Sequence, residues 1–169
     1  ALAASEVAVT TSSGVHAVPL GETVMGAIVA LAKGFPQALR RQDRGEWLRY
    51  TPDEIQGATM GIIGAGHIGS AIAERGKAFG MRVVGIRRSA SDVMKSEPPF
   101  DLLLPPSALE RLLHESDYVV VCAPSTPETA GLIGAEEFQL MKEGARFINV
   151  ARGSLVDEPA LVDSLRSGH

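Results

Sequence analysis

Three glycines in the middle of the chain have a spacing that could serve phosphate binding. Gly64, Gly66 and Gly69 form the pattern G-x-G-x-x-G between a short apolar run and a segment with helical periodicity. Such a loop needs glycine where the chain turns tightly, where the backbone approaches a pyrophosphate, and where a helix packs closely on a strand. The following helix offers unpaired N–H groups and a partial positive charge to the phosphates. The pattern in this context predicts dinucleotide binding; a plain tight turn and the adenosine-type cofactor of a methyltransferase are the alternatives.

The next expected strand ends in two basic residues and a hydroxyl. In NAD-binding units an acidic residue about 20 positions after the glycines accepts hydrogen bonds from the adenosine ribose. Here Arg87, Arg88 and Ser89 occupy that region, and no carboxylate is available there. Guanidinium groups form charge-assisted hydrogen bonds with phosphate and stack on adenine. We therefore expect NADP to be preferred over NAD, with a pair of solvated arginines as the alternative.

The glycine loop and the basic segment at residues 87–89 are expected to be positioned by strands that alternate with helices. Alternation at these lengths predicts an α/β fold with a doubly wound parallel sheet of the Rossmann type. The expected strands are residues 7–10, 59–63, 81–86, 118–123 and 146–150. The expected helices are residues 20–33, the segment from the glycine loop to about residue 79, a segment around residues 109–113, residues 136–142, and a segment after Asp157.

Several residues indicate where elements begin and end. Ser107 and Glu110 have the spacing of a capping box, which would start a helix. Asp157 is a suitable N-cap for the last helix. Pro36 is expected to interrupt the helix that begins near residue 20. The charged stretch around Trp47 is interpreted as exposed surface, with Trp47 as the one residue that anchors it to the domain.

Composition limits the classes of protein that need to be considered. The chain has 169 residues, of which 45% are hydrophobic, and a formal net charge of −4. This is enough for one full domain with a core, and it gives no electrostatic signal for nucleic acid or an anionic membrane. Cys122 is the single cysteine, which excludes an internal disulfide and fits a reducing, cytoplasmic location. No apolar run approaches the roughly 18–20 residues of a membrane span. His16 and His114 are interpreted as surface or turn residues, and nothing near them completes a metal site.

Four segments together resemble a known family. From about Val9 to its end, the chain resembles the D-isomer-specific 2-hydroxyacid dehydrogenases, which include glyoxylate/hydroxypyruvate reductases, D-lactate dehydrogenases and phosphoglycerate dehydrogenases. The resemblance implies hydride transfer between a nicotinamide cofactor and a small 2-hydroxy or 2-oxo acid. A dinucleotide-sensing corepressor or scaffold of the same fold is the alternative. In the family's order, the matching segments are residues 13–17 with Gly21 and Glu22, residues 61–69, residues 122–124 with Pro127 and Thr129, and residues 149–158.

The resemblance assigns cofactor-binding positions along the whole chain. His67 and Ile68 would touch the pyrophosphate, and Thr129 would help to hold it. Cys122 would be part of the wall beneath the adenosine half, with no sign of a nucleophile's role. The full set of expected cofactor positions is Val24, Gly64, Ala65, Gly66, His67, Ile68, Gly69, Arg87, Arg88, Ser89, Cys122, Ala123, Pro124, Thr129, Val150, Ala151 and Arg152.

Arg152 matches the catalytic arginine of the family. Its planar guanidinium could bind the carboxylate of the substrate and orient or polarise the 2-oxo group. Without the resemblance, an arginine after an apolar strand could equally be a structural ion-pair partner. The family also uses a histidine as general acid/base and a glutamate that adjusts its pKa. Neither His169 nor Glu158 matches these two residues.

The expected domain organisation follows from these matches. Residues 1–19 are interpreted as the end of a substrate-domain crossover, and residues 20–169 as a C-terminally truncated dinucleotide-binding domain. We therefore expect a piece of a larger enzyme that is inactive on its own and takes part in a homodimer. The apolar face of the helix at residues 20–33, with Val24 and Ile28, is expected to contribute to the dimer contact.

Overall fold

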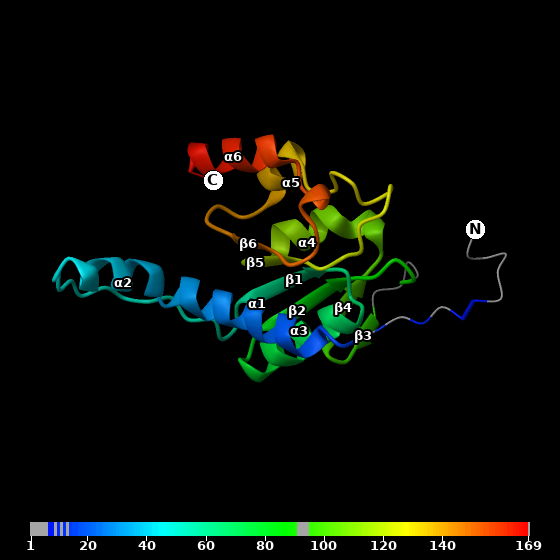
Figure 1. Ribbon diagram of the computed structural model, residues 1–169, viewed down its shortest axis with the longest axis horizontal. Coiled ribbons are helices and arrows are strands. Elements are labelled where there is room, and N and C mark those ends of the chain that lie inside the picture. The colour runs from blue at the N-terminus through cyan, green and yellow to red at the C-terminus, as the bar shows by residue number, and fades with distance from the viewer. Residues whose placement is uncertain (1–6, 9, 11, 13, 91–94, 169) are drawn as a thin grey trace.

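The structure, a computed structural model, describes residues 7, 8, 10, 12, 14–90 and 95–168 (Figure 1). The strands are β1 (Thr59–Ile63), β2 (Arg82–Ile86), β3 (Lys95–Glu97), β4 (Phe100–Leu104), β5 (Tyr118–Val121) and β6 (Arg146–Asn149). The α-helices are α1 (Ala17–Ala32), α2 (Phe35–Asp43), α3 (His67–Ala78), α4 (Leu109–Glu115), α5 (Ala135–Leu140) and α6 (Glu158–Ser167), and short 3-10 helices lie at Pro106–Ala108 and Gly153–Leu155.

The strands form one sheet in the order β3-β4-β2-β1-β5-β6. β1, β2, β4, β5 and β6 run parallel to one another, whereas β3 pairs antiparallel with β4 at one edge. The chain runs from β1 outward through β2 to β4 and then returns to place β5 on the other side of β1. In open α/β sheets, ligands bind beyond the carboxyl ends of the strands where the order reverses in this way. The predicted Rossmann-type doubly wound sheet is confirmed.

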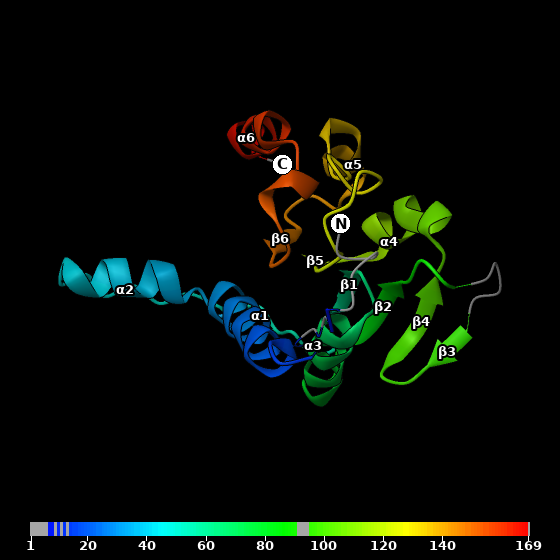
Figure 2. The same cartoon turned by 45° about the vertical axis from the view of Figure 1, so that its right-hand side comes forward.

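Helices cover both faces of the sheet, with α3 and α4 on opposite sides (Figure 2). On one face, Met60 and Ile62 of β1 are fully buried in a cluster with Ile72 of α3 and with residues of α1. On the other face, Ile63 of β1 belongs to a second cluster with Leu112 of α4. Neighbouring residues of β1 therefore serve different clusters, as the two-residue period of a strand requires. Because both faces are covered, the central strands β1 and β5 are buried along their whole length.

The helices α1 and α2 form an arm that projects away from the sheet (Figure 1). α1 begins three residues before the expected start and ends at Ala32, and Gly34 (φ 64°) leads into α2. Pro36 lies in the first turn of α2, so the predicted interruption is confirmed, although a second helix follows it. Trp47 is 91% exposed, so its expected role as an anchor is wrong. None of the described helices alone is long and apolar enough to cross a membrane, and α1 with α2 meets that criterion only as a pair bent by 65°.

Other expected element boundaries have mixed outcomes. Asp157 does cap α6, because its carboxylate accepts a hydrogen bond from the N–H of Ala160 at 3.2 Å. The capping box at Ser107 is not formed: this residue lies inside a 3-10 helix, and α4 has Ala108 as its N-cap without a side-chain hydrogen bond. The predicted strand at residues 7–10 is also wrong where it can be judged, since residues 7, 8 and 10 are irregular and residue 9 lies outside the described residues.

Candidate functional site

Two adjoining cavities lie beyond the carboxyl ends of the parallel strands, where the strand order reverses. The first has a volume of about 470 Å³ and the second about 580 Å³, and they share Ile68 and Cys122 as lining residues. The first cavity is lined by Gly14, residues 64–69, Ile86, Arg87, Arg88 and Cys122. The second is lined by His16, Leu20, Ile68, residues 122–125 and residues 150–152.

The three glycines of the loop face different surroundings. Gly64 has a φ of 110°, and a Cβ atom there would lie 2.6 Å from the backbone nitrogen of Ala123. A Cβ atom on Gly69 would lie 2.3 Å from the carbonyl oxygen of Gly64, so α3 lies directly against the loop. A Cβ atom on Gly66, in contrast, would meet nothing within 4 Å. The loop backbone is therefore closed on the protein side and open at Gly66.

Main-chain contacts hold the loop between two strands. The N–H groups of Gly64 and Ala65 both donate to the carbonyl oxygen of Ile86 at the end of β2, at 3.1 and 2.8 Å. On the other side, the thiol of Cys122 donates to the carbonyl oxygen of Gly64 at 3.1 Å. Gly66 is the N-cap of α3, and no side chain caps the helix. An uncapped helix N-terminus beside an open glycine fits the pyrophosphate of a dinucleotide.

The arginines after β2 lie at the rim of the first cavity. Arg87 donates from Nε to the carbonyl oxygen of Ala65 at 3.0 Å and from Nη1 to the Glu97 carboxylate at 2.8 Å. Arg88 is exposed and lines the same cavity. Ser89 is exposed and is not among the lining residues. The structure thus brings the two guanidinium groups to the glycine loop, as the sequence predicted, and leaves the hydroxyl outside.

The segment after β5 forms the shared wall of the two cavities. Cys122 lines both, and burial raises the pKa of its thiol to about 12. The thiol is therefore protonated at neutral pH and is part of the wall, because a nucleophile would need the thiolate. Ala123 and Pro124 line the second cavity. The hydroxyl of Thr129 donates to the carbonyl oxygen of Pro124 at 2.7 Å and accepts from the N–H of Thr126 at 2.8 Å.

Arg152 lies beyond β6 and is exposed to the second cavity. The side chain of Asn149 fixes its backbone by accepting from the N–H of Ala151 at 2.9 Å and donating to the carbonyl oxygen of Arg152 at 3.0 Å. The guanidinium donates from Nη1 to the carbonyl oxygen of Ala151 at 2.8 Å. Within the described part of the chain, no carboxylate forms an ion pair with Arg152. This arrangement gives no support to the structural ion-pair alternative and leaves a positive charge facing the cavity.

Some expected positions lie outside the cavities, and some residues that line the cavities were not expected there. Val24 is fully buried in the packing of α1 and lines neither cavity. Thr129 is likewise absent from both linings, because its hydroxyl is used within its own turn. The cofactor roles of both residues stay predictions. His16, interpreted from the sequence as a surface or turn residue, is the N-cap of α1 and lines the second cavity with Arg152. Its place in the segment 13–17 that carries the resemblance was the available signal.

Comparison with known proteins shows the family of this chain. Residues 25–169 match the family model described as D-isomer specific 2-hydroxyacid dehydrogenase, NAD binding domain. The chain belongs to this family. It is 36% identical over 157 residues to a D-3-phosphoglycerate dehydrogenase of Methanocaldococcus jannaschii, covering 89% of this chain and 29% of that protein. It is 39% identical over 169 residues to a glyoxylate reductase of Aeropyrum pernix, covering 95% of this chain and 49% of that protein.

Solved structures of the family show the same architecture. A D-isomer specific 2-hydroxyacid dehydrogenase of Xanthobacter autotrophicus Py2, in complex with NADPH and MES, superposes with a TM-score of 0.80 at 36% identity, covering 89% of this chain and 46% of that one. The chain therefore corresponds to the NAD-binding domain of such enzymes and spans no more than about half the length of these relatives. Because the relatives are oxidoreductases, the dehydrogenase interpretation is supported over a corepressor or scaffold. A nicotinamide dinucleotide is the class of cofactor that this domain binds.

Proposed function

We propose that the complete protein interconverts a small 2-oxo acid, such as glyoxylate or hydroxypyruvate, and the corresponding D-2-hydroxy acid. The single observation that carries this proposal is the position of Arg152, whose guanidinium faces the second cavity without a carboxylate partner among the described residues. A two-pronged guanidinium suits the carboxylate of a 2-oxo acid. A bound nicotinamide would supply or accept the hydride. The N–H groups at the start of α3 hold the pyrophosphate, and Arg152 holds the substrate with its carbonyl oriented.

We expect the proton of the reaction to be transferred by groups outside this chain. General acid/base catalysis typically contributes about 10²–10⁴-fold, so the isolated chain should bind cofactor without meaningful turnover. In the complete protein, Arg152→Lys should lower kcat/KM for glyoxylate at least tenfold and leave the Kd for NADPH unchanged, because lysine keeps the charge but loses the planar fork. Steady-state kinetics and calorimetry on the same preparations measure both effects. Loss of NADPH binding with normal turnover at saturation would instead make Arg152 a cofactor residue only.

We further propose that NADP(H) is preferred over NAD(H). The support is the pair Arg87 and Arg88 at the rim of the first cavity, on the same side as the glycine loop. Charge-assisted hydrogen bonds from guanidinium to a phosphate are roughly twice as strong as neutral ones.

The expected domain boundary near residue 20 is also retained as a proposal, and the family match from residue 25 is compatible with it.

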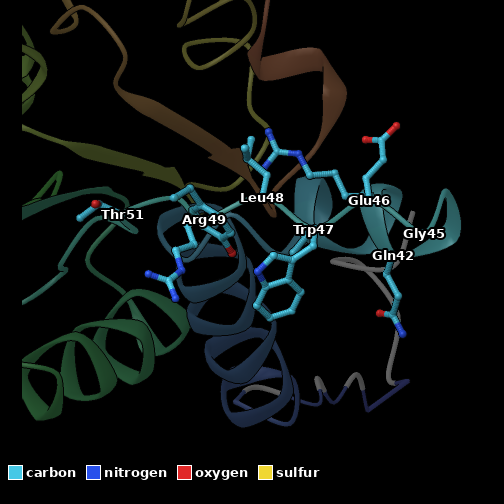
Figure 3. Close-up of a pocket in the computed structure, with 10 residues that line it drawn as sticks. Gln42, Gly45, Glu46, Trp47, Leu48, Arg49 and Thr51 are labelled. Carbon is cyan, nitrogen blue, oxygen red and sulfur yellow. The ribbon is translucent and has the colours of Figure 1, made fainter.

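We also propose that the protein is a homodimer in which the arm formed by α1, α2 and residues 44–51 contacts a second copy. Val24 and Ile28, the residues first expected at the contact, are fully buried within the chain and are excluded from that role. The arm instead exposes Leu39 on α2 (60%), and Trp47 beyond it. A cavity of about 940 Å³ lies beside Trp47 on the arm (Figure 3). Apolar side chains gathered on a projecting segment favour burial against a partner.

A further inference from the structure

The edge strand β3 supplies a carboxylate to one of the two arginines. Glu97 Oε1 lies 2.8 Å from Nη1 of Arg87, with side-chain exposures of 56% and 31%. Arg87 lines the first cavity, whereas Glu97 is not among the described residues that line it. The carboxylate therefore pairs with Arg87 without itself lining the cavity. This ion pair joins the residue that follows β2 to the edge strand β3, and the pattern of the sequence did not indicate it.

The two arginines differ in how they are held. Arg87 is fixed twice, by the Glu97 carboxylate and by the carbonyl oxygen of Ala65 in the glycine loop. Arg88 forms no hydrogen bond or ion pair among the described residues; its side chain is exposed and interacts only electrostatically with the exposed carboxylate of Glu128. Arg88 can therefore reorient toward a bound anion, while Arg87 can do so only by giving up contacts that it already makes.

The position of Glu97 follows from the packing of the sheet edge. The backbone N–H of Arg87 donates to the carbonyl oxygen of Leu104 at 3.1 Å, which fixes the end of β2 against β4. Phe100 of β4 is buried against Gly85, where a Cβ atom would lie 2.7 Å from the ring. β3 pairs with β4, and Glu97 lies opposite Phe100 in this pairing. The carboxylate is thus carried by an element of the sheet and not by an unattached loop.

We propose that Glu97 is a specificity-determining positioning residue, which neutralises Arg87 and leaves Arg88 as the main attraction for a 2′-phosphate on the adenosine ribose. This inference rests on the proposed preference for NADP(H). It predicts that the preference for NADPH over NADH is smaller than two unpaired arginines would give. The Glu97 carboxylate lowers the positive charge at this rim by one unit, so the attraction for the phosphate is weaker than the two arginines of the sequence suggest. The ribose hydroxyl of NADH carries no charge, and its binding is insensitive to Glu97.

The test is a calorimetric titration of the whole chain with NADPH and with NADH. Glu97→Gln removes the charge and keeps an oxygen that can accept from Arg87. It should lower the Kd for NADPH by about three- to tenfold at low salt and leave the Kd for NADH unchanged. Glu97→Asp, which keeps the charge, should retain the wild-type ratio of the two constants. The matched control is Glu143→Gln, because Glu143 is exposed and precedes β6 at the opposite edge of the sheet.

Two further variants separate this inference from the proposal on which it rests. Arg88→Ser should weaken NADPH but not NADH; if it weakens neither, or if wild type binds both equally, the proposed cofactor preference fails. In an Arg87→Met background, Glu97→Gln should still lower the Kd for NADPH and leave that for NADH unchanged, because the carboxylate then has no cation to neutralise it and its charge acts on the phosphate directly. An unchanged NADPH-to-NADH ratio in Glu97→Gln would overturn the role of Glu97, even if the preference itself holds. A parallel loss of both affinities would make Glu97 a purely structural residue and would equally overturn it.

Discussion

Replacing the loop glycines one at a time should separate cofactor binding from folding. In Gly66→Ala the new methyl group meets no protein atom within 4 Å, and the backbone φ of −96° is allowed for alanine. The methyl group would instead occupy the open side of the loop, where we place the pyrophosphate. Loss of one hydrogen bond to a charged phosphate, about 1.5–3 kcal/mol, corresponds to a roughly tenfold to hundredfold higher Kd. The N-cap change itself should cost less than about 1 kcal/mol of stability.

Gly69→Ala is the matched opposite case. Its methyl group would lie 2.3 Å from the carbonyl oxygen of Gly64, a backbone atom that cannot rotate away. Overpacking of this kind costs about 3 kcal/mol at the upper end, and alanine regains about 1 kcal/mol over glycine inside a helix. A net loss of about 2 kcal/mol should lower Tm by about 4–8 °C.

Thermal unfolding followed by circular dichroism and calorimetric titration with NADH measure both variants. We expect Gly66→Ala to melt close to the wild type and bind weakly, and Gly69→Ala to melt early. Wild-type affinity in Gly66→Ala would show that the pyrophosphate does not approach this residue. Wild-type Tm in Gly69→Ala would show that α3 and the loop are not in the close contact described above.

Two further predictions concern association and pH. Leu39→Asp and Trp47→Ser on the arm should each shift the light-scattering mass from dimer toward monomer while leaving Tm unchanged, because both side chains are exposed within the chain; an unaltered mass would contradict the proposed contact. Burial raises the pKa of the Asp101 carboxyl. Hydrogen bonds from Lys77 and from the N–H of Val83, together with the positive charges of Lys77 and Arg82, lower it by more, so the pKa lies below its usual value. The depressed pKa gives stability that is present above the unfolded pKa of about 3.9 and is lost as pH falls through the lower folded value. Asp101→Asn should therefore cost about 1 kcal/mol or less at pH 7, since the side chains are partly exposed. In denaturant titrations this difference should shrink as the pH falls below about 3.9 and disappear below the folded pKa, and a constant difference would refute it.

The central fold and the glycine loop were predictable because local chemistry determines them. β1 and β5 are buried on both faces, so their apolar runs are continuous and easily recognised. The glycine spacing fixes where a Cβ atom is excluded, and the structure bears this out at Gly64 and Gly69. The cap at Asp157 depends only on residues in the same turn.

The features that were predicted wrongly or missed depend on tertiary contacts and neighbouring elements that the local sequence pattern does not contain. β3 consists of Lys-Ser-Glu and has no apolar run, so neither the strand nor the role of Glu97 could be read from periodicity. Pro106 starts a 3-10 helix that contains Ser107, which prevents the serine from acting as an N-cap. Trp47 looked like an anchor because large aromatic residues are usually buried, but it lies on the projecting arm. The cytoplasmic location stays a prediction from composition.

The cofactor site has two tasks, to hold the phosphates and to choose between NAD(H) and NADP(H), and the way the glycine loop is anchored separates them. The loop is held by the carbonyl oxygen of Ile86 and by the thiol of Cys122, and among the side chains at residues 87–89 Arg87 adds one hydrogen bond, from Nε to the carbonyl oxygen of Ala65. The side chains of Arg88 and Ser89 can therefore be exchanged without rebuilding the place where the phosphates lie. An engineer, or natural divergence, could therefore change which dinucleotide is chosen by altering only the rim. Because hydrogen bonds within the protein fix the loop, little of its conformational entropy is left to be lost when a dinucleotide binds.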